Sequence, residues 1–311
     1  MKISVWDGGL TDSYMRQVSQ LGADGIDFGN GTAFPGVTEQ GYPDLDKVVR
    51  IKKRIHSWGL EINRVTLPDI TEKFMQNQPG GERELENSCE AVRIFAQAGI
   101  PIVRQRFAGD TFDLSEKYLS VHRGGYTSRG ERPNRSISPS TVPTYEELDQ
   151  WWDRFVKVYN ALVPIAEETG VLLALHPSDI PHPNTPFGGL GFHRVIDAFP
   201  SANVGYLYCC GTRAEAGGSS IVLDEINNYG RKGKIFTVHM RNVRGSLATA
   251  EGFEEVLLDD GDMNIAKIFI ELKKVGFDGF INPDHIPNLE GGVGLAYSVG
   301  YLKAILASLA I

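Results

Sequence analysis

Short apolar runs alternate with longer stretches of helical periodicity along the whole chain, and this alternation limits the possible folds more than any other feature. The eight apolar runs are Ile3–Trp6, Gly25–Phe28, Glu61–Val65, Ile100–Gln105, Val171–His176, Val204–Cys209, Ile235–Met240 and Gly279–Asn282. The eight helical stretches lie near residues 11–21, 44–57, 82–98, 145–169, 191–199, 221–229, 263–275 and 295–308. Continuously apolar runs such as Val171–Leu175 are typical of parallel strands buried on both faces. The repeated βα units therefore predict a (β/α)8 TIM barrel.

A doubly wound parallel sheet is the alternative fold, because it also alternates strands with helices. A nucleotide-binding sheet of that kind carries a glycine-rich phosphate loop after its first strand, and Asp7-Gly8-Gly9 does not match that pattern. The length of 311 residues also suits one large barrel. We therefore expect residues 1–311 to form a single barrel domain.

One segment, residues 107–143, interrupts the alternation after the fourth predicted strand. It is rich in serine, proline, glycine and arginine and has no clear periodicity, so we expect a structureless insertion. Loops that follow barrel strands lie at the C-terminal face, where the active sites of this architecture are found. We expect the insertion to cover the barrel mouth or to reach into the mouth of a partner subunit, and a solvated surface loop is the alternative.

Composition restricts the partners of such a barrel. The formal net charge of −8 argues against binding to nucleic acid or to an anionic lipid surface. No apolar run approaches the roughly 20 residues that a membrane span needs. Three cysteines, two of them adjacent, do not make a disulfide framework and indicate a reducing cytoplasm. We expect a cytoplasmic homo-oligomer that acts on a small molecule.

Four side chains that commonly bind metals follow four consecutive predicted strands. They are His176, Cys209, His239 and Asp284, and each stands at or directly after the end of an apolar run. The strand ends of a barrel converge on one mouth whatever their separation in sequence, so the four side chains can meet there. Two imidazoles, a thiol and a carboxylate suit Zn(II), Fe(II) or Mn(II). A structural histidine is the alternative for either imidazole alone, but the whole set favours a metal site.

Five short motifs in these segments occur in the order and spacing of a known family. They are His-Pro-x-Asp-x-Pro at 176–181, Cys-x-Gly-Thr at 209–212, His-x-Arg-Asn-Val at 239–243, Asp-Gly-Asp-Met at 260–263 and Pro-Asp-His at 283–285. The set resembles the mannonate dehydratase family. The resemblance implies a xylose-isomerase-like barrel, a divalent ion (usually manganese), and dehydration of D-mannonate to 2-keto-3-deoxy-D-gluconate in hexuronate catabolism. It also implies that His176, Cys209, His239 and Asp284 bind the ion and that His285 transfers a proton.

The sequence departs from that family where a substrate would bind. Asn282 stands where the family has an arginine before Pro-Asp-His, and the segment 189–192 lacks a second expected arginine. Asparagine offers hydrogen bonds to a substrate but not the charged planar fork that arginine offers a carboxylate. We therefore expect mannonate itself to be a poor substrate. Arg104 and Arg106, at the end of the fourth strand, are candidates to replace the missing arginines, and ordinary surface residues are the alternative.

Other residues near the predicted mouth have two interpretations each. Tyr297 is the candidate for a second proton carrier, or it packs its own helix. Asp179 orients His176 or contacts substrate, or it caps a turn of the backbone. Arg241 and Asn242 contact substrate hydroxyls, or they close the loop after the seventh strand.

These observations leave three hypotheses about function. The first is a metal-dependent lyase that removes water from a sugar acid, with the ion stabilising an enediolate and His285 moving a proton. The second is a metal-dependent sugar isomerase or epimerase, which would share the enediolate. The third is a non-catalytic barrel in which the metal is structural. An endonuclease is disfavoured because the chain is acidic and lacks a basic groove signature.

Overall fold

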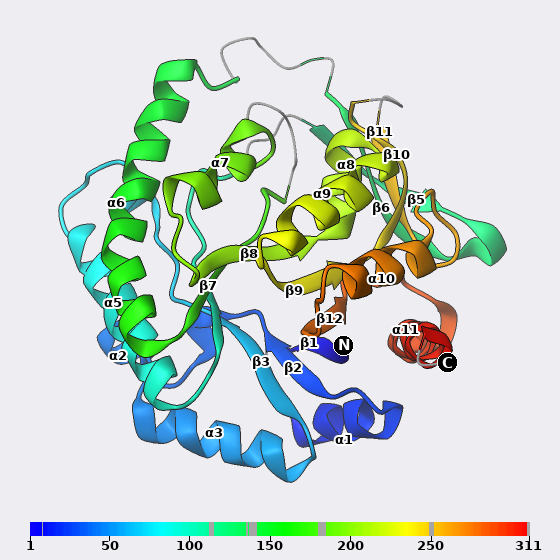
Figure 1. Ribbon diagram of the computed structural model, residues 1–311, viewed down its shortest axis with the longest axis horizontal. Helices are drawn as coiled ribbons and strands as arrows, with labels where there is room; N and C mark the ends of the chain where they lie inside the picture. Colours follow the sequence, from blue (N-terminus) through cyan, green and yellow to red (C-terminus); the bar gives the residue numbers. More distant parts are fainter. Residues whose placement is uncertain are drawn as a thin grey trace.

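The computed structural model describes residues 1–7, 9–111, 115–134, 136, 142–179, 185–248 and 252–309. Eight parallel strands in this part of the chain close into a barrel, which confirms the predicted TIM barrel (Figure 1). In order around the barrel they are β1 (Lys2–Asp7), β2 (Gly25–Phe28), β3 (Glu61–Thr66), β4 (Ile102–Arg104), β7 (Leu172–Leu175), β8 (Val204–Cys209), β9 (Ile235–Met240) and β12 (Phe280–Pro283). Each of them overlaps one of the eight predicted strands.

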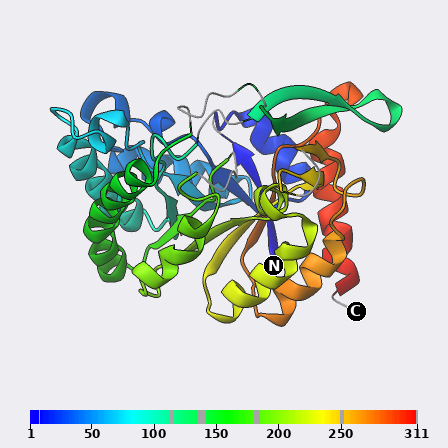
Figure 2. The same cartoon turned by 90° about the horizontal axis from the view of Figure 1, so that it is seen from above.

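Helices surround the barrel and cover the outer face of its strands (Figures 1 and 2). They are α1 (Asp12–Leu21), α2 (Val37–Gln40), α3 (Leu45–Ser57), α4 (Glu72–Met75), α5 (Glu82–Gln97), α6 (Tyr145–Thr169), α7 (Leu190–Ala198), α8 (Cys210–Gly217), α9 (Ser219–Arg231), α10 (Ile265–Lys274) and α11 (Gly294–Leu309). Within the described ranges, no helix combines the length and the apolar composition that a membrane span requires.

The longest helix, α6, shows how the sequence specifies these elements. Thr144 and Glu147 form a capping box at its first turn, because each side chain accepts a hydrogen bond from the backbone N–H of the other. The residues that face the barrel recur at helical spacing and are buried; they include Trp151, Phe155, Val158, Tyr159, Leu162 and Ile165. Gly170 ends the helix at φ 77°, a left-handed conformation in which its N–H donates to the Ala166 carbonyl.

The insertion after β4 is not structureless, so that expectation was wrong. It contains two strands, β5 (Ser115–Val121) and β6 (Thr127–Pro133), which form an antiparallel hairpin. The hairpin continues into a four-stranded sheet with β11 (Gly252–Val256) and β10 (Asn242–Ser246), in the order β10-β11-β6-β5. In the hairpin strands β5 and β6 the buried side chains are polar, namely Ser120, Ser128 and Glu131, whereas Leu119 is 70% exposed. The usual apolar alternation of a strand is therefore absent from this segment.

This small sheet lies at the C-terminal face of the barrel. Thr127 of the hairpin pairs with Asn288 in the segment after β12, and β10 follows β9 after a single residue. In Figure 2 the hairpin projects on the side of the barrel opposite to the N-terminus, where β1 begins. The insertion is therefore placed beside the barrel mouth, at the loops that follow β9 and β12.

Phe155→Ala tests the packing of α6 on the barrel. The side chain is fully buried, and its ring centre lies 4.4 Å from that of Tyr159 and 5.1 Å from that of Phe187. Truncation leaves a cavity, so we expect the free energy of unfolding to fall by about 3–5 kcal/mol. Tyr145→Ala, on the same helix but 89% exposed, is the matched control and should change it by less than about 0.5 kcal/mol. Urea denaturation followed by circular dichroism measures both, and equal effects would contradict the packing.

Candidate active site

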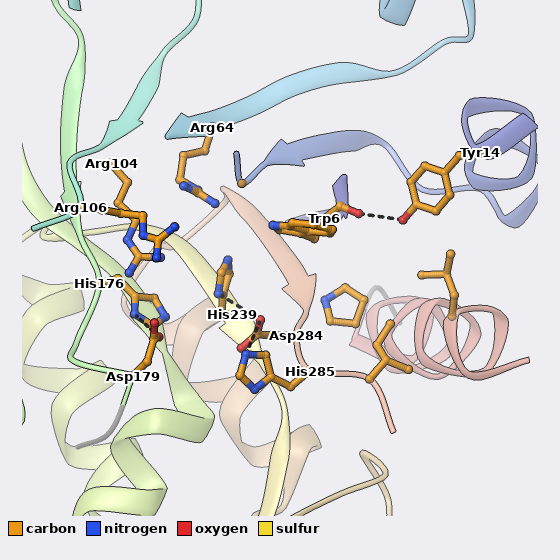
Figure 3. A pocket seen from close by; sticks show the side chains of 14 residues that line it. Trp6, Tyr14, Arg64, Arg104, Arg106, His176, Asp179, His239, Asp284 and His285 are labelled. Atoms are coloured by element: carbon orange, nitrogen blue, oxygen red, sulfur yellow. Dashed lines mark hydrogen bonds and ion pairs between the residues drawn. The ribbon is translucent and has the colours of Figure 1, made fainter. Parts of the chain in front are cut away.

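A cavity of about 630 Å³ opens at the C-terminal end of the barrel strands. Its lining residues come from strands β1, β3, β4, β9 and β12, from the segments that follow β2, β4, β7 and β12, and from helices α1 and α11 (Figure 3). They are Trp6, Tyr14, Gly29, Arg64, Arg104, Arg106, His176, Asp179, His239, Pro283, Asp284, His285, Ile286 and Leu295. The barrel therefore brings His176, Asp179, His239, Asp284 and His285 to one cavity, although they span more than a hundred positions of sequence.

The two ring nitrogens of His239, near the end of β9, have different surroundings. Its Nε2 lies 3.1 Å from Oδ2 of the fully buried Asp27, and a carboxylate there fixes the proton on Nε2. Its Nδ1 is buried without a hydrogen-bond partner within the described residues. A buried imidazole nitrogen with a free lone pair is suited to a metal ion, and a carboxylate behind the ring is the common support of a metal-binding histidine.

His176 follows β7 and presents its ring in a similar way. Its Nδ1 lies 2.6 Å from the Pro177 carbonyl and 3.3 Å from Oδ1 of Asp179. The Nδ1 proton is thereby directed to the protein, which leaves Nε2 as the ligand atom. Burial, with the nearby positive charge of Arg104, keeps the pKa of His176 well below its ordinary value. The ring is therefore neutral, as a metal ligand must be.

Cys209 ends β8 and caps α8, which begins directly after that strand. Its Sγ accepts from the Thr212 backbone N–H at 3.5 Å and from the Thr212 hydroxyl at 3.1 Å. Burial raises the pKa of the Cys209 thiol to about 12, although Arg241 acts to lower it. One ligand atom from each of His176, Cys209 and His239 lies within 4.8 Å of the others. These three residues fit the donor set of a divalent transition metal.

Asp284 directly after β12 adds a carboxylate to the three. Its Oδ1 lies 3.5 Å from His239 Nδ1, and its Oδ2 lies 3.7 Å from Cys209 Sγ. Burial alone would raise the pKa of Asp284, but His285, His239 and Arg241 hold it well below its usual range. The carboxylate is therefore ionised beside the other three side chains. The four predicted metal ligands are brought together, and the unused His239 nitrogen among them supports a metal in this place.

His285 stands next to these groups in a strained backbone conformation. Its φ is 44°, in the left-handed region that few non-glycine residues adopt. Its Nδ1 lies 2.6 Å from Oε1 of Glu255 on β11, and its Nε2 lies 4.0 Å from Oδ1 of Asp284. Arg241 and burial act to lower the pKa of His285, but Asp284 and Glu255 outweigh them and raise it. Glu255 therefore holds the ring through Nδ1, and Nε2 is left for groups in the cavity.

Glu255 links His285 to the inserted hairpin. The side chain of Arg129 on β6 lies 3.1 Å from Glu255 Oε1, and the same oxygen lies 3.2 Å from Arg241 Nε. Arg241 in turn contacts Glu215 at 2.9 Å, Cys209 at 3.4 Å and the Asp284 carboxylate. The hairpin therefore contributes one of the charges that fix the geometry of the site, which gives the insertion a structural connection to the chemistry.

Five of the predicted site residues do not line the cavity, and one of them is Cys209, which is fully buried beside Asp284. Arg241 is buried beneath Asp284 and positions that carboxylate. Asn242 binds only backbone groups, accepting from Met263 N at 3.0 Å and donating to the Leu258 carbonyl at 2.8 Å, so it closes the loop after β9.

The other two are Asn282 and Tyr297. Asn282 is fully buried, and neither polar atom of its amide has a hydrogen-bond partner within the described residues. Tyr297 donates its hydroxyl to Asp259 at 2.5 Å, outside the group of residues that line the cavity. The structure therefore gives no cavity contact to either of them.

Sequence reasoning missed three residues that shape the cavity. Arg64 and Asp27 form a buried ion pair across β3 and β2, and Trp6 near the end of β1 also lines the cavity (Figure 3). Their signal was present in the sequence, because Asp27 lies between Ile26 and Phe28 and Arg64 stands inside the predicted strand 61–65. A charge in a buried strand is expected only where a partner or a function retains it.

Comparison with known proteins adds independent information. A family model described as D-mannonate dehydratase (UxuA) matches residues 138–309. Mannonate dehydratase 2 of Halalkalibacterium halodurans is 23% identical over 271 residues, 77% of this chain and 78% of that protein. Mannonate dehydratase of Geobacillus thermodenitrificans is 25% identical over 313 residues, 85% of this chain and 83% of that protein. The crystal structure of mannonate dehydratase from Streptococcus suis serotype 2 has a TM-score of 0.83 at 23% identity, covers 98% of this chain and 93% of that chain, and shares the fold.

Elemental analysis of purified protein tests the metal site. We expect about one divalent ion per chain, and we expect His176→Ala and Asp284→Ala to lose most of it, because each removes one of four ligands. His56→Ala, an exposed histidine on α3, is the matched control and should keep the ion. Circular dichroism shows whether the variants stay folded. An unchanged metal content in both ligand variants would refute the assignment.

Proposed function

The chain belongs to the D-mannonate dehydratase family and is an enzyme of the hydro-lyase class, and on that premise we propose that it removes water from a sugar acid, D-mannonate or a close relative, with a divalent metal ion. The observation that carries the proposal is the cluster of His176, Cys209, His239 and Asp284, three of which line one cavity together with His285. Dehydration of a sugar acid requires the removal of a weakly acidic proton from carbon and the departure of a hydroxyl group. Both needs are met by a bound cation and a positioned proton carrier.

The metal ion belongs to the proposal as a group that His176, Cys209, His239 and Asp284 would hold. When bound, it would stabilise negative charge on the substrate oxygens. We propose manganese, as the resemblance to the family implies, and Fe(II) and Zn(II) also suit this donor set. Arg241 supports the site, because it holds the Asp284 carboxylate and the Cys209 sulfur in their places.

His285 is the proposed proton carrier. Its Nδ1 is engaged by Glu255, so Nε2 is the nitrogen from which a proton reaches the departing hydroxyl group. The carboxylate of Glu255 orients the ring and stabilises its protonated form, as a carboxylate does for a catalytic histidine in general. Tyr297 has no place in this step, since its hydroxyl is bound to Asp259 away from the cavity.

The setting of the enzyme is also a proposal. Cys89, Cys209 and Cys210 are all free thiols, which supports a reducing compartment such as the cytoplasm. Leu119 and Val121 on the edge strand β5 are 70% and 68% exposed, which supports contact between copies of this chain in a homo-oligomer. The net charge of −8 supports a small-molecule substrate rather than nucleic acid.

A substrate panel tests the proposed reaction. The manganese-loaded protein is incubated with D-mannonate, related aldonic acids and neutral ketoses, and the products are identified by NMR. We expect a 2-keto-3-deoxy acid from at least one aldonic acid, because a hydro-lyase removes water across neighbouring carbons. Turnover of ketoses alone would favour the isomerase or epimerase hypothesis and would refute the proposed function.

His285→Asn tests the proton carrier separately from the metal. Asparagine tolerates the left-handed backbone of this position better than most residues, so the variant should fold. His285 is not one of the four proposed ligands, so the metal content should stay unchanged. We expect kcat to fall by roughly 10²–10⁴, the usual contribution of general acid–base catalysis. A wild-type kcat on the best substrate would show that His285 moves no proton in the slow step.

A further inference from the structure

Three arginines form one wall of the cavity, on the side away from His285 (Figure 3). Arg64 comes from β3, Arg104 ends β4, and Arg106 follows it. Trp6 and Leu295 add aromatic and apolar surface to the cavity lining. The cavity therefore combines three positively charged side chains with apolar surface and with His176, His239 and Asp284 of the proposed metal site.

The arginines differ in how their charges are balanced. Arg64 is 1% exposed and donates to Asp27 and, at 2.8 Å, to the Thr66 hydroxyl. Arg106 is half exposed, and its only described carboxylate contact is Asp69 at 4.0 Å. Arg104 forms neither a hydrogen bond nor an ion pair with any residue in the described ranges. Its side chain lines the cavity, and the described part of the chain gives it no hydrogen-bond or ion-pair partner.

An unpartnered guanidinium in this place is costly. Burial lowers the pKa of Arg104, and the neighbouring charge of Arg64 lowers it further. Asp179 and Asp110 act in the opposite direction, but neither forms an ion pair with Arg104, and Asp179 already lies 3.3 Å from His176 Nδ1. A cation that is retained beside a like charge without an ion pair is expected where an anionic ligand completes the site.

Arginine recognises carboxylates through two parallel N–H donors, and neutral hydroxyl groups do not match this fork as well. Asn282, the residue directly before Pro283 and Asp284, carries no charge and does not line the cavity. Of the residues around the proposed metal site, the arginine wall is therefore the part that suits a carboxylate.

We propose that Arg104, flanked by Arg64 and Arg106, binds the carboxylate of the sugar acid and so determines that this enzyme accepts acids rather than neutral sugars. The inference rests on the proposed function, because it assigns the specificity of that same site. It places recognition of the acid on β3 and β4, across the cavity from His285.

Direct binding tests the inference. Isothermal titration calorimetry with D-mannonate, D-gluconate and the neutral polyol D-mannitol is carried out on wild type, Arg104→Met and Arg104→Lys. Loss of a charged bidentate contact should weaken binding of the acids by roughly 10- to 100-fold in Arg104→Met. Arg104→Lys keeps the charge without the fork and should lie between the two. Arg93→Met, an exposed arginine of α5 that contacts Glu90 at 3.5 Å, is the matched control and should bind as wild type does.

Thermal stability separates a binding role from a structural one. Because Arg104 has no partner in the described residues and lies beside Arg64, Arg104→Met should melt at the wild-type temperature or above it. The increase in melting temperature that D-mannonate gives the wild type should be reduced in this variant. A variant that melts much lower and keeps its affinity for the acids would show a structural role and overturn the inference.

Two further results keep the inference separate from the proposed function. Arg106→Gln changes a half-exposed side chain, so it should fold in any case, and it should weaken acid binding by up to roughly fivefold. Turnover of an aldonic acid with unchanged affinity in Arg104→Met would overturn the inference and leave the proposed function standing. If the wild type binds none of the acids, the inference fails, whereas the product analysis of the substrate panel judges the proposed function by itself.

Discussion

The buried carboxylate of Asp27 joins the two halves of the site. One oxygen accepts from Arg64 in the cavity wall, and the other lies 3.1 Å from Nε2 of His239. Asp27 is fully buried, and these two partners hold its pKa below the ordinary value despite the desolvation. Removal of one partner from a buried ion pair typically costs about 3–5 kcal/mol, so the three residues form a unit. The orientation of a proposed metal ligand is thereby tied to the position of a cation in the substrate cavity.

A second network supports the other side of the cavity. Glu255 of the small sheet binds His285, and both Arg129 of the hairpin and Arg241 lie within about 3 Å of the same carboxylate oxygen. Arg241 also donates a hydrogen bond to the Asp284 carboxylate, so the network includes a proposed metal ligand. The inserted hairpin thus contributes to the site through charges that orient the histidine and the aspartate, and it needs no contact with substrate for this role.

The sequence predicted the barrel, and it singled out four side chains that the barrel brings close together, for reasons that are physical. Parallel strands buried on both faces give continuous apolar runs, and a polar residue such as His176 at the end of such a run stands out. The geometry of the barrel then brings the strand ends together whatever their spacing. The hairpin was missed because its inward positions carry Ser120, Ser128 and Glu131, so no apolar alternation marks its strands.

The roles of polar residues were harder to predict, because they depend on partners that sequence does not reveal. Asn242 follows β9 just as a substrate-binding residue would, yet backbone groups of the next loop use its amide. Arg64 resembles a misplaced charge in β3 until Asp27 on the neighbouring strand is seen to pair with it.

The central claim is that four strand ends form one metal centre in this cavity, with Cys209 among its ligands. X-ray absorption at the metal edge of the zinc-loaded protein tests this claim most directly, since sulfur scatters differently from nitrogen and oxygen. The account predicts one sulfur at about 2.3 Å together with nitrogen and oxygen ligands at about 2.0–2.2 Å. The sulfur contribution should disappear in Cys209→Ser. A spectrum of the unmodified protein with nitrogen and oxygen ligands alone would contradict the account.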